Sequence, residues 1–331
     1  MGGDVAVSVS ADAAASLPVP APVPRAAAEQ PHGAARTPAG WRPVVLLSGL
    51  PGPLAAESAA ACLRQGWELS PVGLTGPKAL PRYEVPCVTT EGTSNGPAGV
   101  TISLVSSNDP LAQRAAVEEA LRKYGDRLVA VDCTHPSAVM ANAELFASTG
   151  CPFVMGTTGG DQEALQKLVG DAGVYALIAS NMCKQIVALQ AGVERMAADF
   201  PGAFSGYTMR IEESHQKTKA DTSGTARDMV NSFQGLGLDF SVEQIQMIRD
   251  EEAQVAFGVP AGALGGHAFH TYTLQSADGS VEFQIKHNVV GRRSYGEGVA
   301  DAVAFLARMK AEGSPKRIFN MVDVLRGGAM R

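Results

Sequence analysis

The chain has 331 residues, of which 45% are hydrophobic and 18% are charged. This length and composition allow two domains with hydrophobic cores of their own. The formal net charge is −6 and the sequence has no long basic run, which argues against nucleic acid as a partner. No apolar stretch approaches the ~20 residues that a membrane-spanning helix needs.

The cysteines are few and widely spaced. Their number is odd, and the sequence contains neither a C-x-x-C motif nor a Cys/His pair at metal-ligand spacing. We therefore predict reduced, mostly buried thiols in an intracellular compartment, and no metal site. The five positions are Cys62, Cys87, Cys133, Cys151 and Cys183.

Residues 1–40 differ in composition from the rest of the chain. They are rich in Ala, Pro, Ser and Val and have neither helical nor strand periodicity, which predicts a disordered leader. An organelle transit peptide and a plain flexible tail are both open interpretations. The acidic residues Asp4, Asp12 and Glu29, together with the scarcity of arginine before Arg25, count against a transit peptide.

From residue 43 to residue 180, short apolar runs alternate with helical patterns. The continuous apolar run Val44–Leu47 is typical of a strand buried on both faces of a parallel sheet, and a helix to about Gln65 follows it. This alternation predicts an α/β fold with a Rossmann-type doubly wound sheet. Further strands are predicted at 68–72, 100–105, 128–132, 151–155 and 174–178, and further helices at 111–124, 137–147 and 162–169.

The turn after the first strand has the spacing of a phosphate-binding loop. Its small residues Gly49, Gly52 and Ala55 would let the backbone approach a pyrophosphate at the start of the next helix. Pro51 and Pro53 remove two N–H donors from the same loop.

The second predicted strand bears on the choice of cofactor. It does not end in the acidic residue that would bind the ribose hydroxyls of NAD. Lys78 and Arg82 follow it, which mildly favours a phosphorylated cofactor, although ordinary surface charges explain both residues as well.

The pattern changes after Pro201. A helix at 182–199 is followed by strands at 207–212, 242–248, 267–274 and 281–287, with a helix at 223–233 among them. We predict a smaller α+β domain with a mixed sheet. His267, His270 and His287 lie on these strands without a Cys or carboxylate partner at ligand spacing, which predicts structural histidines.

The last part of the chain contains a long predicted helix at 294–309, and residues 316–325 are expected to return to the first domain. The sequence thus divides into a leader (1–40), a dinucleotide-binding domain (41–181), a substrate-binding and oligomerisation domain (182–293), and a C-terminal helix and tail (294–331).

Residues 210–229, RIEESHQKTKADTSGTARDM, concentrate groups that carry chemistry. His215 is titratable, and Lys217 and Lys219 supply ammonium groups. The Ser-Gly-Thr run at 223–225 precedes a helical pattern, where free backbone N–H groups form an anion site. Together these groups suit chemistry on a small dianionic substrate, although a polar loop before a helix is more often only solvated.

The order of residues in ESHQKTKADTSGTA resembles the signature of dihydrodipicolinate (4-hydroxy-tetrahydrodipicolinate) reductases, which is close to E-x-H-H-x-x-K-x-D-x-P-S-G-T-A in bacteria. Gln216 stands in place of the second histidine, and the proline is missing. DCTHPSA at 132–138, GTTG at 156–159 and HNVVGR at 287–292 are similar to other segments of the family. The SHQ motif, FPGAFSGY and the IFNMVDVLR tail resemble the plant-like branch, and the resemblance covers about residues 43–331.

The resemblance implies NADPH- or NADH-dependent reduction of a cyclic dicarboxylate imine in lysine biosynthesis through diaminopimelate. His215 would be the proton donor, and Lys219 would stabilise charge on the ring nitrogen or a carboxylate. The remaining substrate-binding residues would be Gln216, Ser223, Gly224, Thr225 and Arg292. The cofactor-binding residues would be Gly49, Gly52, Ala55, Gly156, Thr157, Thr158, Ala179, Asn181 and Met182.

Two other functions stay open. A non-catalytic relative that serves as an assembly scaffold is favoured by the proline-containing glycine loop and disfavoured by His215, Lys219 and the Ser-Gly-Thr run. A Rossmann-type dehydrogenase for a hydroxy or keto acid is the weakest alternative. The resemblance further implies a homo-oligomer, and the chloroplast stroma and the cytoplasm are both possible locations.

Overall fold

The computed structural model describes residues 42–78, 80–86, 99–157 and 159–328. The predicted leader at 1–40, Cys87 and the candidate cofactor residue Thr158 lie outside the described residues. None of the described helices is both long enough and apolar enough to span a membrane.

The first sheet has the strand order β13-β8-β7-β6-β1-β3-β5-β4, with β2 paired beside β1. Its neighbours pair in parallel, except that β4 is antiparallel to β5. The strands are β1 (Val44–Ser48), β2 (Glu68–Leu69), β3 (Val72–Thr75), β4 (Arg82–Val85), β5 (Val100–Ser106), β6 (Leu128–Asp132), β7 (Phe153–Met155), β8 (Ala176–Ile178) and β13 (Ile318–Phe319).

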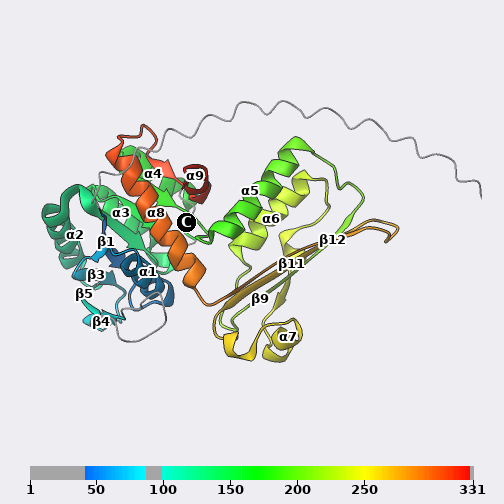
Figure 1. The fold of residues 1–331 in the computed structure, drawn as a ribbon, viewed down its shortest axis with the longest axis horizontal. Helices are drawn as coiled ribbons and strands as arrows, with labels where there is room; N and C mark the ends of the chain where they lie inside the picture. Colours follow the sequence, from blue (N-terminus) through cyan, green and yellow to red (C-terminus); the bar gives the residue numbers. More distant parts are fainter. Residues whose placement is uncertain (1–41, 79, 87–98, 158, 329–331) are drawn as a thin grey trace, which may run out of the picture. The chain divides into compact units, whose positions relative to one another are not determined.

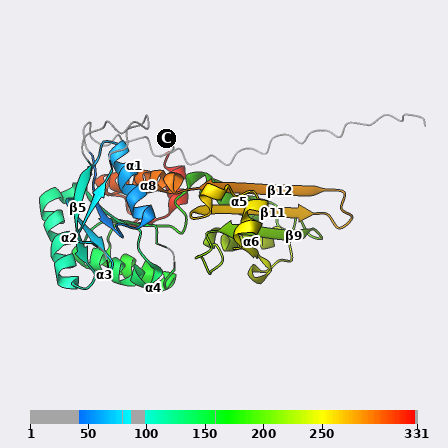
Figure 2. The same cartoon turned by 90° about the horizontal axis from the view of Figure 1, so that it is seen from below.

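Helices cover both faces of this sheet, as Figures 1 and 2 show. On β1, Val45 and Leu47 pack with α1 and α8, whereas Val44 and Leu46 pack into the core on the side of α2, α3 and α4. The doubly wound sheet predicted from the sequence is therefore confirmed. The helices are α1 (Pro53–Arg64), α2 (Pro110–Tyr124), α3 (Val139–Thr149), α4 (Gln162–Ala172), α8 (Arg293–Ala311) and α9 (Met321–Arg326).

Two predicted elements of this half differ from the structure. The single strand expected at 68–72 is two strands, β2 and β3, and the residues between them include Pro71, which cannot donate a backbone hydrogen bond. The helix expected at 137–147 begins with a 3-10 turn at Pro136–Ala138 and continues as α3 to Thr149.

The second sheet has the order β10-β9-β11-β12. It is mixed, as predicted, because β10 is parallel to β9 while β11 is antiparallel to both of its neighbours. Its strands are β9 (Thr208–His215), β10 (Gln246–Ile248), β11 (His267–Gln275) and β12 (Glu282–Val290), and its helices are α5 (Lys184–Asp199), α6 (Gly224–Gly235) and α7 (Glu251–Ala256).

The helices α5 and α6 run side by side over this sheet (Figure 1). Ile211 and Tyr272 from the sheet pack with Val193 of α5 and Phe233 of α6 in one hydrophobic core. The strand predicted at 242–248 is wrong over its first half, because Val242–Gln244 forms a 3-10 turn closed by a Ser241 capping box.

The C-terminal segment reaches the first sheet, where β13 pairs in parallel with β8. α8 packs closely on the segment that enters α5. A Cβ atom at Gly298 would lie 1.6 Å from the Met182 carbonyl oxygen. The buried ion pair of Lys184 with Asp301 ties the start of α5 to the same helix.

Candidate functional site

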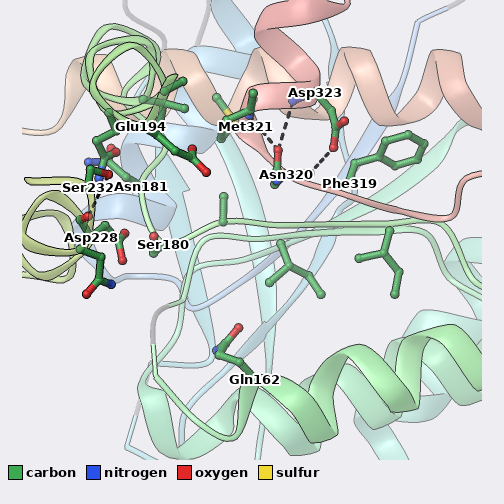
Figure 3. Close-up of a pocket in the computed structure, with 18 of the residues that line it drawn as sticks. Gln162, Ser180, Asn181, Glu194, Asp228, Ser232, Phe319, Asn320, Met321 and Asp323 are labelled. Atoms are coloured by element: carbon green, nitrogen blue, oxygen red, sulfur yellow. Dashed lines mark hydrogen bonds between the residues drawn. The ribbon is translucent and has the colours of Figure 1, made fainter. Parts of the chain in front are cut away.

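A cavity of about 950 Å³, shown in Figure 3, lies beside α4, α5, α6 and α9. Its lining includes Ala179, Ser180 and Asn181, which follow β8. Figure 3 shows Asn320 bonded to Asp323 at the start of α9, where Asn320 Oδ1 accepts the Asp323 N–H at 3.1 Å and Asp323 Oδ2 accepts the Asn320 N–H at 2.9 Å.

A second cavity, of about 730 Å³, lies at the carboxyl ends of the parallel strands, where ligands of doubly wound sheets bind. Gly49 and Gly52 line it after β1, Thr75 at the end of β3, Thr134 after β6 and Thr157 after β7. Its size falls within the range of ligand pockets, about 300–1,000 Å³.

The glycine loop lies close to the end of β6, which is the neighbour of β1 in the sheet. Gly49 has φ +111°, and a Cβ atom there would lie 2.3 Å from the Cys133 carbonyl oxygen. The Gly52 N–H is used within the loop, because it donates to the Gly49 carbonyl at 2.7 Å. Among the described residues, the backbone N–H groups of Leu54 and Ala55 at the start of α1 have no acceptor, so they provide the local anion site.

Asp132 connects the loops that follow β6 and β7. It is fully buried and accepts from Asn142 Nδ2 at 3.1 Å and from Thr157 Oγ1 at 3.2 Å. Thr157 Oγ1 also accepts the Thr134 N–H at 2.8 Å. Burial raises the pKa of Asp132 to about 6, against the opposing effect of these hydrogen bonds. The network fixes Thr157 at the floor of the strand-end cavity.

A third cavity, of about 210 Å³, brings together residues predicted for the substrate and the cofactor. Leu54, Gly156 and Arg292 line both this cavity and the strand-end cavity, so the two adjoin at these residues. The predicted site residues that line the third cavity are Gly156, Asn181, Met182, His215, Gln216 and Arg292.

The other predicted substrate residues do not line this cavity. Lys219 Nζ donates to Asp221 Oδ1 at 2.7 Å, and the Ser223 N–H donates to Glu213 Oε2 at 3.0 Å. Thr225 Oγ1 accepts from Asn181 Nδ2 at 2.8 Å, which joins the start of α6 to the loop after β8. None of the described residues lies within 4 Å of the position that a Cβ atom would take at Gly224. Ala55 is buried in α1, and Ala179 lines the cavity of Figure 3.

A buried polar cluster lies behind His215. Glu213 Oε1 lies 2.7 Å from Arg249 Nη2 and 3.9 Å from His215 Nδ1, and its Oε2 lies 3.6 Å from His270 Nε2. Strand pairing places Glu213 across from His270, a carboxylate neighbour that spacing along the chain did not indicate. That the histidines are structural stays a prediction. One donor atom from each of Glu213, His215 and His270 lies within 4.8 Å of the other two, but the Arg249 guanidinium already neutralises this carboxylate.

The charges in the cluster follow from burial and from these contacts. Burial lowers the pKa of His215 to about 3, and the nearby charge of His270 acts in the same direction. Burial raises the pKa of Glu213, but the contacts with His270 and Arg249 outweigh it and lower that pKa to about 2. Glu213 is therefore a carboxylate, and His215 is neutral in the free protein near pH 7.

The fold should lose stability in acid. Burial lowers the pKa of both His215 and His287 from 6.5 to about 3, so the unfolded chain binds two more protons there than the folded chain over most of this interval. The raised pKa of Asp132 opposes this below about 6, because folding takes up one proton there. Unfolding thus takes up a net of one proton between about pH 6 and 4.5. As the pH falls through this range, the free energy of unfolding decreases by at most about 1.4 kcal/mol per pH unit.

Urea denaturation at pH 7.5, 6 and 5 measures this dependence. Below about pH 4.5 the lowered pKa of Glu213 adds a loss of the same sign. The variant His287→Phe removes one of the two histidine contributions and should nearly flatten the curve between pH 6 and 4.5. A wild-type free energy of unfolding that stayed constant from pH 7.5 to pH 5 would contradict the assignment.

Sequence reasoning missed two residues that hold this cluster in place. Arg249 donates to the Glu213 carboxylate and to the Lys219 carbonyl, at 2.7 and 2.8 Å. Gln254, which is fully buried on α7, donates to the His215 carbonyl at 2.7 Å. Both follow β10 in a segment whose pattern predicted no helix, so only the pairing of β10 with β9 could have indicated them.

Comparisons with known proteins agree on one family. The model for the N-terminus of dihydrodipicolinate reductase matches residues 89–182, and the model for its C-terminus matches residues 186–325. The probable 4-hydroxy-tetrahydrodipicolinate reductase 1, chloroplastic, of Oryza sativa subsp. japonica is 42% identical over 288 residues, which cover 87% of this chain and 80% of that protein. The 4-hydroxy-tetrahydrodipicolinate reductase 2, chloroplastic, of Arabidopsis thaliana is 45% identical over 259 residues, which cover 77% and 74%.

The fold is also found in a solved structure. Dipicolinate-bound dihydrodipicolinate reductase from Paenisporosarcina sp. TG-14 superposes with a TM-score of 0.52 at 18% sequence identity, covering 84% of this chain and 97% of that one.

Proposed function

Because the chain belongs to the dihydrodipicolinate reductase family, we propose that it is a 4-hydroxy-tetrahydrodipicolinate reductase of lysine biosynthesis. The observation that carries this proposal is the small cavity that His215, Gln216 and Arg292 share with Gly156 and Asn181. It places a titratable ring, an amide and a guanidinium beside the loops that follow β7 and β8.

The residues around the strand-end cavity fit a dinucleotide. Gly49 and Gly52 of the glycine loop carry no side chain that would hold a pyrophosphate off the backbone, although Pro53 and Leu54 also line the cavity. The start of α1 offers two backbone N–H donors. Gly156, Thr157, Thr158, Ala179, Asn181 and Met182 would hold the nicotinamide end. A reduced nicotinamide supplies a hydride when bound, and both NADPH and NADH suit this donor set.

The chain's own groups would then bind and protonate a dicarboxylate. Arg292, half-buried between the two cavities, suits a carboxylate because its guanidinium presents paired donors. The free N–H groups at the start of α6, at Gly224 and Thr225, suit a second one. His215 would give a proton to the reduced ring, and Lys219 would stabilise its charge, which requires Lys219 to exchange Asp221 for substrate.

The domain boundaries follow as part of the proposal. Residues 41–181 would bind the dinucleotide, 182–293 would bind substrate and form the oligomer, and 294–331 would return to the first domain. The edge strand β12 supports a homo-oligomer, since it exposes 46% of Phe283 and 56% of Val290. The chloroplastic relatives favour the chloroplast as the location.

A coupled assay tests the activity. Dihydrodipicolinate synthase would generate the substrate, and loss of NAD(P)H absorbance would report turnover; we expect oxidation that depends on the synthase. Quenching of the two tryptophans by NADPH and NADH measures cofactor binding separately. Absence of turnover and of quenching at millimolar cofactor would contradict the proposal and favour a scaffold.

A further inference from the structure

A row of polar side chains crosses the second sheet behind His215. The strand register places Glu213 of β9 directly opposite His270 of β11, and His270 directly opposite His287 of β12. His215 lies two residues after Glu213 and therefore on the same face of the sheet. This is the face that α5 and α6 cover, because Ile211 of the same alternation belongs to their shared core. We call these four residues the histidine row.

The rings of the histidine row are in contact. The ring centroids of His215 and His270 lie 5.0 Å apart with nearly perpendicular planes, and those of His270 and His287 are stacked at 4.6 Å. His270 is only 2% exposed. A charge on His270 would therefore act on His215 through the protein interior, where solvent screens it little.

The row is rich in polar atoms without partners. Within the described residues, both ring nitrogens of His270 and the Nδ1 atoms of His215 and His287 are buried without a hydrogen bond. Each buried polar atom left unpaired costs about 1–3 kcal/mol, so apolar side chains would make a more stable sheet here. Buried titratable groups beside a cavity are typical of proton-handling sites.

Glu213 lies between the two imidazoles. Its Oε2 is 3.6 Å from His270 Nε2, and its Oε1 is 3.9 Å from His215 Nδ1. Arg249 and the Ser223 N–H hold the carboxylate in this position. Because Nδ1 of His215 faces the carboxylate, Nε2 is the ring nitrogen left for the cavity.

The neutral state of His215 raises a chemical difficulty for a proton donor. A neutral imidazole that gives up its one N–H proton becomes an imidazolate, which is a very unfavourable product at neutral pH. His215 therefore needs a second proton on its ring when it acts as an acid. The ring of His270 lies against that of His215, with centroids 5.0 Å apart.

We propose that His270 stores a proton against Glu213 and passes it to His215 during the reduction, an inference that rests on the proposed reductase function. With a dianionic substrate beside His215, the proton moves from His270 to Nδ1 of His215. The N–H bond at Nε2 then breaks, and its proton forms the new bond on the reduced substrate. Solvent returns a proton to Nε2, and the Nδ1 proton goes back to His270, so solvent supplies the consumed proton and no electrons move.

Other titratable and charged groups face this pair and are unchanged in His270→Phe. Arg249 after β10 and Lys219 after β9 act electrostatically on His215. Tyr272 on β11 and His287 on β12 stack against the His270 ring, and Asp228 on α6 acts on Tyr272.

The test is His270→Phe in the coupled assay at pH 6 and pH 8. At pH 8 we expect kcat to fall at least tenfold, with KM for the substrate within twofold of wild type. At pH 6 the deficit should shrink to about threefold, because solvent protons can charge His215 directly once the cation beside it is removed. His287→Phe, which replaces the ring on the other side of His270, should keep the wild-type pH profile of kcat.

Equal losses at both pH values, or an unchanged kcat, would overturn the proposal and leave His270 a packing residue. An inactive wild-type protein would instead contradict the reductase function itself. Should His270→Phe not fold, ¹⁵N NMR of the wild-type histidines decides the question. We expect His270 to carry protons on both ring nitrogens in the free protein and to lose one when pyridine-2,6-dicarboxylate is added; an unchanged His270 would contradict the proposal.

Discussion

Replacing His215 by alanine should reduce kcat by about 10²–10⁴-fold, the usual range for loss of a general acid. The side chain lines the cavity next to Gly156, whereas the backbone carbonyl of His215 is held by Gln254 independently of the ring. The proposed cofactor loops after β6 and β7 are held together through Asp132 and Thr157, so quenching by NADPH should stay within twofold of wild type. The coupled assay and the fluorescence titration together separate the chemical step from cofactor binding.

Two lysines of the same loop provide the comparison. Lys219→Ala should also lose most turnover, because the half-buried Lys219 is proposed to leave Asp221 and stabilise charge on the substrate. Lys217 is exposed two residues away, and Lys217→Ala should keep at least half of the wild-type kcat. Wild-type rates in both His215→Ala and Lys219→Ala would show that the proton and the charge stabilisation come from other residues.

Gly298→Ala adds a single methyl group and should strongly destabilise the protein. The new Cβ would lie 1.6 Å from the Met182 carbonyl oxygen, far inside van der Waals contact. Either α8 or the segment before α5 must move, and the buried pair of Lys184 with Asp301 resists that movement. We expect a loss above about 3 kcal/mol in the free energy of unfolding, as for severe overpacking.

Gly192→Ala is the matched control. Gly192 lies within α5, and no atom in the part of the chain that the structure describes comes within 4 Å of the position that a Cβ atom would take there. The substitution should stabilise the helix by up to about 1 kcal/mol, the usual propensity difference between glycine and alanine. Urea denaturation of both variants gives the comparison. A Gly298→Ala protein as stable as wild type would mean that α8 does not pack on Met182 in solution.

The first sheet could be predicted well because its strands are buried on both faces. A run such as Val44–Leu47 has no polar position, which leaves few alternatives to a central parallel strand. β4 and β13 were not predicted as strands, and α7 was not predicted as a helix. β4 has only Val85 fully buried, and β13 is two residues long, so neither gives a recognisable period.

The arrangement of the candidate site was harder to predict from the sequence. Local motifs indicated His215, Gln216 and Arg292, which do meet at one cavity. Glu213 and His270 are 57 positions apart along the chain and become neighbours only through the register of β9 and β11. Register depends on the packing of whole strands, and shifting it by one residue would turn His270 to the other face.

The pairing of β13 with β8 has a consequence for how the protein is made. The first sheet starts at residue 44 but its last strand is synthesised only at Ile318–Phe319, after the entire second sheet. While the chain is still on the ribosome, β8 is an uncovered edge that a neighbouring nascent chain can pair with. A polypeptide released before β13 is synthesised would keep β8 as an unpaired edge strand, and this product would be prone to aggregate.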